Sequence, residues 1–558
     1  MKVSTGWLSP PDAIGGLDHL GTQTPCQLIY QQLLPGITNV TDRARYYSLY
    51  PWLIWSFDKR HPNADASRFV ELFRRADFLL TLIAERHAQA TGEPDFLHGA
   101  AMVGRTQLPT AFERLESDRV IDLDEFATRE KVQTRYFKAK LGGLGQYYLG
   151  TLVELQLLDT ANKEWIEYTS ELGLPIAEAV ESDVTKPKAD QFWRIVESGS
   201  VTAKDLNALS SFCPCGLKPG TKEHALLEEL FFVDREEYAE SGSQRRASIA
   251  MLLHLASSLV SRPDAELEVG TFRSAIYTGH LPGGESWSVP RSLADTAKWW
   301  GIYQANELLS ISFLSLLASA LYELERSQAN GDTPFQTIEQ LADFIATGPI
   351  GRKIVRAAGT DAYEEYVAKL RKTSPALGDW ENPKHEQQLA EELLGSQRRN
   401  HEEGDPGVLV QIAFELLTLL ATRLESSENP YEGLLISGDD LHRYPINLLT
   451  YKRRTKIWQQ ATVREVLRDL VHWSLVTHLH VSLRKLRQTG RSTFRFRPGE
   501  LGLELTDDVP PPTRTTPRFN TTTQMLVDLG ALRPLTNDRR GAMEVTALGR
   551  SWLERHLG

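Results

Sequence analysis

A dense run of positive charge lies between Arg443 and Arg497. This stretch holds thirteen lysines and arginines and only two acids, whereas the whole chain of 558 residues has a net charge of −11. Clustered basic side chains are what the phosphate backbone of a nucleic acid requires. The same side chains could instead bind an acidic protein partner or the acidic rest of this chain, or form a solvated face. The candidate nucleic-acid-binding residues are Lys452, Arg453, Arg454, Lys456, Arg484, Lys485, Arg487, Arg491, Arg495, Arg497, Arg539 and Arg540.

The end of the basic stretch alternates in the manner of a β-strand. Phe494 and Phe496 would lie on one face of this strand, and Arg495 and Arg497 on the other. A Pro-Gly turn and a second alternating segment follow. The pattern therefore predicts a small β-hairpin near the C-terminus.

A second group of candidate residues is aromatic. Tyr46, Tyr47 and Trp52 are close in the sequence and follow Arg43 and Arg45. Exposed aromatic rings can stack on bases or anchor a partner protein. Ordinary packing between helices is the alternative. We take the three aromatic residues as candidate partner-binding residues.

Cys213 and Cys215 are the one closely spaced cysteine pair, since the third cysteine is Cys26. A tetrahedral zinc site needs four ligands, and no second pair of cysteines or histidines lies near these two in the sequence. His224 is a possible third ligand. The pattern therefore favours reduced, metal-free thiols, and we expect no metal and no cofactor.

The sequence motifs that usually mark an active site do not occur in this chain. The glycines from Gly142 to Gly145 have no Lys-Ser or Lys-Thr after them, so they do not form a phosphate-binding loop. There is no Gly-x-Ser-x-Gly motif, and the acids lie mostly in segments with helical spacing. We expect a protein that is not an enzyme, with a dispersed catalytic site as the alternative.

Two distant segments end in the same order of elements. In each, an apolar helix end is followed by a short strand, a polar turn, a second strand and a threonine shortly before a glycine. Thr169 and Thr546 are good N-cap residues for the closing helix. Residues 162–163 and 537–541 suit hairpin turns. This order resembles the back half of a winged helix, a fold that contacts DNA in some proteins and protein in others.

Helical periodicity dominates the remaining chain, with strong helices predicted from 66 to about 90, from 292 to 326, and from Pro406 to about Arg423. The fold class we expect is a mainly α, multi-domain helical protein with two winged-helix-like modules and a small β-hairpin near the C-terminus. The expected domains are an N-terminal helical domain (1–125), a winged-helix-like module (126–185), a central helical domain (186–435), a basic helix plus β-hairpin segment (436–506) and a C-terminal winged-helix-like module (513–558).

The start of the chain and its cysteine content indicate a compartment. The chain begins without the apolar segment of a signal peptide, and it has only three cysteines. The most apolar helical segment, around 308–322, is short for a bilayer span. We therefore expect a cytoplasmic protein without membrane contact.

Four short motifs, together with the two similar tails, carry a family resemblance. The motifs are Ala44–Ser48, Leu141–Tyr148, His480–Leu486 and Thr493–Phe496. Through them the chain resembles the large, mostly helical, winged-helix accessory proteins of bacterial anti-phage (genome-defence) operons. The resemblance implies a DNA-sensing or scaffold subunit that works beside an ATPase or nuclease encoded elsewhere.

These observations leave three hypotheses about function. The first is a non-enzymatic DNA-binding or sensing subunit of a multi-protein bacterial complex in anti-phage defence. The second is a protein-only scaffold whose winged helices clasp partner subunits, and the third is an enzyme with an unrecognised helical active site. Acids crowd the first winged-helix-like module, so we expect that module to contact protein. The C-terminal module with residues 443–497 would then contact DNA.

Overall fold

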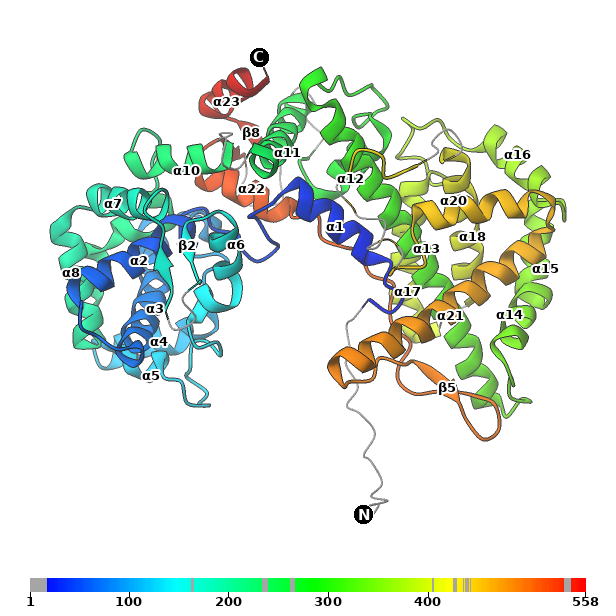
Figure 1. Ribbon diagram of the computed structural model, residues 1–558, viewed down its shortest axis with the longest axis horizontal. Coiled ribbons are helices and arrows are strands. Elements are labelled where there is room, and N and C mark those ends of the chain that lie inside the picture. Colours follow the sequence, from blue (N-terminus) through cyan, green and yellow to red (C-terminus); the bar gives the residue numbers. More distant parts are fainter. Residues whose placement is uncertain are drawn as a thin grey trace, which may run out of the picture. The chain divides into compact units, whose positions relative to one another are not determined.

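The computed structural model describes residues 18–161, 165–232, 239–260, 266–403, 406–424, 429–434, 436, 441, 443–535 and 543–557. The described chain is mainly helical, as predicted (Figure 1). The α-helices are α1 (Gln23–Leu33), α2 (Tyr46–Arg60), α3 (Ala66–Thr91), α4 (Leu108–Ser117), α5 (Leu123–Ala127), α6 (Leu149–Glu154), α7 (Gly173–Val184), α8 (Lys186–Ser198), α9 (Ala203–Ala208), α10 (Lys222–Phe232), α11 (Ala239–Leu259), α12 (Val269–Thr278), α13 (Ala294–Asn330), α14 (Ile338–Thr347), α15 (Pro349–Ala358), α16 (Tyr363–Thr373), α17 (Glu386–Glu403), α18 (Pro406–Arg423), α20 (Leu448–Ile457), α21 (Val463–Thr489), α22 (Phe519–Asp528) and α23 (Ala547–Leu557).

The strands of the described residues form four small antiparallel sheets of two strands each. The pairs are β1 (Ile121–Asp122) with β4 (Ser200–Val201), β2 (Leu158–Asp159) with β3 (Glu167–Tyr168), β5 (Phe496–Pro498) with β6 (Leu503–Leu505), and β7 (Leu532–Pro534) with β8 (Met543–Val545). The β5–β6 pair is the hairpin predicted near the C-terminus.

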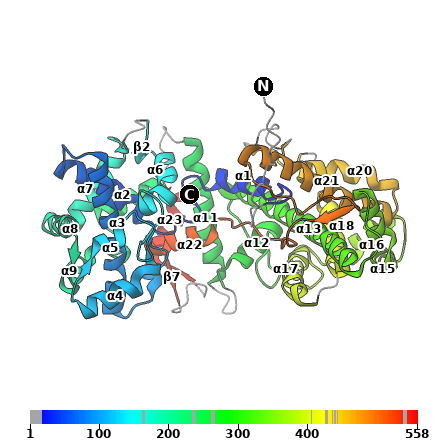
Figure 2. The same cartoon turned by 90° about the horizontal axis from the view of Figure 1, so that it is seen from below.

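The chain forms two compact units that differ from the five consecutive domains expected. Unit 1 comprises Met1–Gln31, Arg273–Ser288 and Ala297–Thr515, and unit 2 comprises Gln32–Phe272, Val289–Thr296 and Thr516–Gly558. The C-terminal segment joins unit 2 because β8 and α23 pack against α11. Both views show α23 beside α11 (Figures 1 and 2). Helices of the expected central domain are divided between the two units for the same reason: contacts distant in sequence decide the grouping.

The long helix α13 provides much of the core of unit 1 and confirms the helix predicted over 292–326. Its serines do not interrupt the core, because Ser312, Ser315 and Ser319 each donate to the carbonyl oxygen four residues earlier at 2.8 Å. Residues 291–330 and α18 are long and apolar enough to cross a membrane by length and composition alone. The apolar windows of these helices are 94% and 72% buried inside the protein, which is typical of core helices.

Two parts of unit 2 have the order helix, strand, strand, helix, which agrees with the order of these elements that the sequence predicted. We call residues 149–184 the first module and residues 519–557 the last module. Each enters its first strand through the same bend, in which Leu157 N–H donates to Leu152 O at 2.8 Å and Ala531 N–H to Leu526 O at 2.9 Å. The predicted turns at 162–163 and 537–541 lie outside the described residues. A π-helical turn, Leu144–Tyr148, leads directly into α6. The assignment of the first and last modules as winged helices stays a prediction.

Candidate metal centre

Four side chains of the types that bind metals meet at one point in unit 2. They are His87, His98, Cys213 and Cys215, and their ligand atoms all lie within 4.8 Å of one another. His98 and Cys213 are buried, whereas His87 and Cys215 are half-buried. Each residue offers one nitrogen or sulfur atom, so the cluster has the composition of a Cys₂His₂ site.

Local turns bring the two histidines together. The helix α3, which carries His87, ends at Gly92 with a left-handed φ of 68°. A 3₁₀ turn, Asp95–Leu97, then returns the chain to the end of α3. The rings of His87 and His98 consequently lie 5.0 Å apart between centroids and perpendicular to one another.

The cysteines lie on a loop that a buried arginine holds in place. Arg45 donates to the carbonyl oxygens of Ser211 at 2.6 Å and Cys213 at 2.5 Å. The guanidinium also donates two hydrogen bonds to Glu223, at 3.0 and 2.9 Å. Because Arg45 and Glu223 are both only 1% exposed, this pair fixes the loop from inside the core.

The distances fit a tetrahedral ion. His98 Nδ1 lies 3.2 Å from Cys213 Sγ, and His87 Nδ1 lies 3.2 Å from Cys215 Sγ. Typical zinc–sulfur and zinc–nitrogen bond lengths place such ligand atoms about 3.5 Å apart at a tetrahedral angle. The other ring nitrogen of His98, Nε2, lies 3.1 Å from a carboxylate oxygen of Glu93. An outer carboxylate of this kind fixes the tautomer of a ligating histidine and leaves Nδ1 available for the metal.

The electrostatics of the cluster favour a thiolate. The hydrogen bond from Cys213, together with His98 and His87, lowers the pKa of Cys215 to about 4. Burial, together with Cys215, raises the pKa of Cys213. Burial alone would lower the pKa of His98, but its interactions with Cys215 and Glu93 outweigh burial and raise it. Thiolates are the form in which cysteines bind metals.

Thiolate and imidazole ligands in a tetrahedral arrangement suit Zn²⁺. Two thiolates and two neutral imidazoles would balance the charge of the ion, and four protein ligands close its coordination shell. Closed sites of this type stabilise a fold, whereas catalytic zinc sites keep one position for water or substrate.

Sequence reasoning missed this cluster because two of its residues lie far away in the chain. The expectation of metal-free thiols rested on the lack of further ligands near Cys213 and Cys215, and the fold supplies His87 and His98. Their separation from the cysteines matches no zinc-motif spacing, so the sequence offers no signal for them. His224, the ligand suggested by sequence, lies elsewhere, with Nε2 2.8 Å from Leu529 O.

The basic candidate residues that the structure describes lie in unit 1 and fall into two groups. Half of those described are bound to other groups, and the rest are exposed. The bound side chains are Lys452 with Leu424 O (2.9 Å), Arg454 with Asp469 (2.6 Å), Arg484 with Arg443 O, Lys485 with Asp18 O, and Arg495 with Asp507 (2.5 Å). The exposed ones are Arg453, Lys456, Arg487, Arg491 and Arg497. Arg539 and Arg540 lie outside the described residues.

Arg495 corrects the alternation expected for the hairpin. It is 5% exposed, whereas Arg497 is exposed. The strand β5 begins at Phe496, so Arg495 precedes the pleated segment and turns inward to Asp507.

The aromatic candidates form a core rather than the partner-binding surface that the sequence suggested. Tyr46, Tyr47 and Trp52 are at most 1% exposed. The Tyr46 and Tyr47 rings contact the ring of Tyr148 at centroid distances of 5.0 and 5.7 Å, and Trp52 contacts Phe192 at 5.3 Å. A partner protein could reach these rings only if unit 2 opened.

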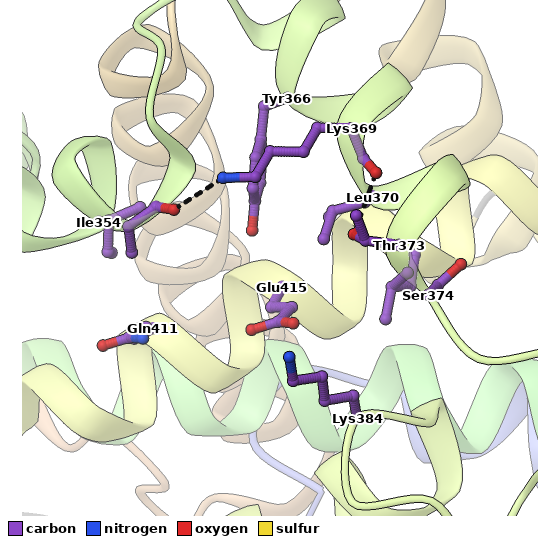
Figure 3. A pocket seen from close by; sticks show the side chains of 11 residues that line it. Ile354, Tyr366, Lys369, Leu370, Thr373, Ser374, Lys384, Gln411 and Glu415 are labelled. Carbon is purple, nitrogen blue, oxygen red and sulfur yellow. Dashed lines mark hydrogen bonds between the residues drawn. The ribbon is translucent and has the colours of Figure 1, made fainter.

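A pocket of about 190 Å³ in unit 1 bears on the enzyme hypothesis. In Figure 3, the side chains of Glu415 and Lys384 face each other across it. Burial raises the pKa of Glu415, a feature common at active sites, although structural ion pairs also shift pKa values. Lys369 donates to Ala357 O at 3.1 Å and Ala358 O at 2.7 Å, so it caps the end of α15. We assign no reaction to this pocket.

Comparisons of the chain with protein-family models, curated proteins and solved structures gave no match. The metal centre is therefore assigned from its own geometry.

Proposed function

We propose that the protein binds one Zn²⁺ ion through His87, His98, Cys213 and Cys215, and that this ion is a structural centre of a non-enzymatic binding protein. The observation that carries the proposal is the convergence of the four ligand atoms within 4.8 Å. The four protein ligands would close the coordination shell, which supports a structural rather than a catalytic ion.

The ion would join segments that the sequence keeps apart. His87 and His98 lie at the end of α3, and the cysteines lie on the loop that Arg45 holds. In the unfolded chain these ligands are scattered, so binding of the ion favours the folded form of unit 2.

Zinc content and thermal stability test this proposal. The full-length protein, purified under reducing conditions, should contain about one zinc per chain by elemental analysis. Removal of the metal with a chelator, or the Cys213→Ser or His98→Gln substitution, should lower the melting temperature by roughly 5 °C or more, because a structural zinc contributes several kcal/mol.

Cys26→Ser is the matched control. Cys26 is buried, but it lies in unit 1 outside the cluster. This variant should keep its zinc even if its own site is destabilised. A wild-type protein that takes up no zinc on reconstitution, or zinc that survives Cys213→Ser and is lost in Cys26→Ser, would contradict the proposal.

A second function is supported by the exposed arginines of unit 1. We propose that Arg487, Arg491 and Arg497, at the end of α21 and on the β5–β6 hairpin, bind the phosphate backbone of DNA. The support is their exposure in a stretch where other basic side chains are already bound to protein groups. Together with the family resemblance, this favours a DNA-sensing subunit of a cytoplasmic anti-phage complex. Partner subunits with ATPase or nuclease activity remain part of the same proposal.

Salt-dependent DNA binding tests this second function. Replacing Arg487, Arg491 and Arg497 by alanine should weaken binding to duplex DNA and reduce the slope of log affinity against log salt by roughly one unit for each phosphate that the variant no longer neutralises. The matched control replaces three exposed lysines of unit 2, namely Lys131, Lys138 and Lys140. Equal weakening in the two variants, or none in the arginine variant, would count against DNA binding at this site.

A further inference from the structure

The two cysteines of the metal centre differ in how far a small molecule can reach them. Cys213 is fully buried, whereas Cys215 is half-buried. Cys215 also forms part of the wall of a cavity of about 690 Å³ in unit 2, together with His87. A small molecule in this cavity would therefore meet the Cys215 sulfur, while the Cys213 sulfur stays inside the protein.

A tight turn holds the two sulfur atoms close together. Pro214–Gly216 forms a 3₁₀ turn, in which Gly216 N–H donates to Cys213 O at 2.8 Å. The proline fixes its own φ and so favours the turn. The two sulfur atoms lie within 4.8 Å of each other. Cα atoms two residues apart on a turn fall within the span of roughly 4.4–6.8 Å that a disulfide bridges, so side-chain rotation can bring the sulfur atoms into bonding distance.

The position of the turn does not depend on a metal ion. Arg45 donates from inside the core to the carbonyl oxygens of Ser211 and Cys213. These hydrogen bonds involve the main chain and none of the four ligand side chains. The two cysteines should therefore remain neighbours after an ion has left.

The charges of the cavity wall indicate what kind of reagent can reach Cys215. The wall carries charged side chains of both signs, among them Glu93, Asp183, Lys188 and Lys218. Such a wall favours no ion of either sign, whereas a small uncharged molecule needs no counter-charge there. Hydrogen peroxide and small organic hydroperoxides are uncharged and oxidise thiolates.

We propose that Cys213 and Cys215 form a redox-active pair, which a small peroxide converts to a disulfide with release of the zinc ion. Cys215 is the position of attack, and Cys213 is the resolving thiol. The proposal rests on the proposed zinc centre and adds the regulation of that site by an oxidant.

The reaction has two steps. The Cys215 thiolate attacks one oxygen of the peroxide; an S–O bond forms, the O–O bond breaks and hydroxide leaves. The sulfur is thereby oxidised by two electrons to a sulfenic acid, and the peroxide is reduced. The Cys213 thiolate then attacks this sulfur; an S–S bond forms, the S–O bond breaks and a second hydroxide leaves. Two thiolates and one hydrogen peroxide thus give one disulfide and two hydroxide ions.

Oxidation should weaken the link that the ion provides within unit 2. Thiolates are the form in which cysteines bind zinc, so the disulfide leaves the ion with only two imidazole ligands. The ion should then dissociate, and the end of α3 would no longer be joined to the loop that Arg45 holds. The new disulfide closes only a very short loop, so it replaces little of the lost stabilisation.

Treatment of the zinc-loaded, full-length protein with hydrogen peroxide tests the proposal. A colorimetric chelator follows the released zinc, and mass spectrometry of the peptide that carries both cysteines reports their oxidation. We expect one zinc ion released for each disulfide formed. The pair should be oxidised about tenfold faster than the buried Cys26, or faster still. Dithiothreitol with added zinc should restore both the thiols and the metal.

Serine variants separate the roles of the two cysteines. In Cys213→Ser, peroxide should produce a sulfenic acid at Cys215 that dimedone traps, and no disulfide. In Cys215→Ser, the buried Cys213 should react slowly. Cys26→Ser is the matched control and should release zinc at the rate of the wild type. The measurements on the wild type need no variant, so they stand even if a serine variant fails to fold.

Two results would overturn the proposal. One is a zinc-loaded wild type in which Cys213 and Cys215 are oxidised no faster than Cys26. The other is peroxide that displaces zinc without joining the two sulfur atoms. A protein that takes up no zinc would refute the zinc centre instead, and formation of the disulfide in that protein would leave the redox-active pair standing.

Discussion

The first and last modules of unit 2 share a backbone hydrogen-bond pattern but differ in surface charge. In each, the threonine hydroxyl donates to a carbonyl oxygen at the bend before the first strand and accepts from the N–H of the following glycine. These distances are 2.6 and 2.9 Å for Thr169, and 2.7 and 3.1 Å for Thr546. The same hydrogen bonds form although most neighbouring side chains differ. The pattern is therefore set by a few residues with special backbone or capping roles.

The surfaces of the two modules show what this pattern leaves open. The first module exposes Asp159, Glu167 and Glu171 around its hairpin. In the last module, Arg533 is paired with Glu544 and Arg555 with Glu228, each at 2.5 Å. The modules thus share a shape without sharing a charge. The expected division into a protein-binding first module and a DNA-binding last module stays a prediction.

The largest effect that tests the shared pattern should come from its glycines. A Cβ atom on Gly173 would lie well under 3.0 Å from Leu157 O, and one on Gly549 would lie equally close to Ala531 O. Both obstacles are backbone atoms, which cannot easily move away. Gly173→Ala and Gly549→Ala should each reduce the free energy of unfolding by about 2–4 kcal/mol in urea denaturation.

Gly150→Ala is the control for this comparison. A Cβ atom there meets nothing within 4 Å, and the residue lies inside α6. The variant should be as stable as the wild type or more stable by up to about 1 kcal/mol. If only one of the two module glycines tolerated alanine, the modules would not be equivalent at their closing helices.

A smaller effect should come from the threonines. Thr169→Val and Thr546→Val keep the side-chain shape but remove both hydrogen bonds of the hydroxyl. Thr546 directly precedes its closing helix as the sequence predicted, whereas the N-cap of α7 is Leu172, so the prediction of Thr169 as an N-cap is wrong. Each substitution should cost about 1 kcal/mol of unfolding free energy, the usual net value of a side-chain hydrogen bond. The Thr→Ser variants at the two positions retain the hydroxyl and should retain most of the stability. Valine variants as stable as the serine variants would show that the hydroxyl hydrogen bonds contribute nothing.

The modules could be predicted from the sequence because their determinants are local. A threonine before a glycine, a polar turn and flanking apolar residues lie within a short segment, and each has a direct conformational meaning. The helices α3, α13 and α18 were predictable for the same reason, since their periodicity is continuous along the chain.

The metal centre depends on contacts between residues distant in sequence, and so does the pairing of the basic side chains with other protein groups. His98 meets Cys213 only because α3 and the loop held by Arg45 pack in the same unit. Likewise, the positive charge of Lys485 is evident in the sequence, but its contact with Asp18 O is not. The sequence shows how many basic residues a segment carries. Burial and pairing in the fold decide which of these charges a ligand can reach.

The smallest expected effect concerns the one position of the shared bend where the two modules differ in backbone preference. Gln156 has a φ of +54°, and the equivalent Gly530 has a φ of +73°. Left-handed backbone costs a residue with a side chain about 1 kcal/mol, whereas glycine adopts it freely. Gly530→Ala should therefore destabilise unit 2 by about 1 kcal/mol through its backbone. The new Cβ would also lie 3.3 Å from Pro219 Cγ, so the proline ring must move by a few tenths of an ångström to accept it. Gln156→Ala removes the side chain and keeps the strain, and Gln156→Gly removes both. The glycine variant should consequently be more stable than the alanine variant by about 0.5–1 kcal/mol. Equal stability of these two variants would mean that the first module carries no strain at its bend, and that the bends of the two modules are alike in hydrogen bonds only.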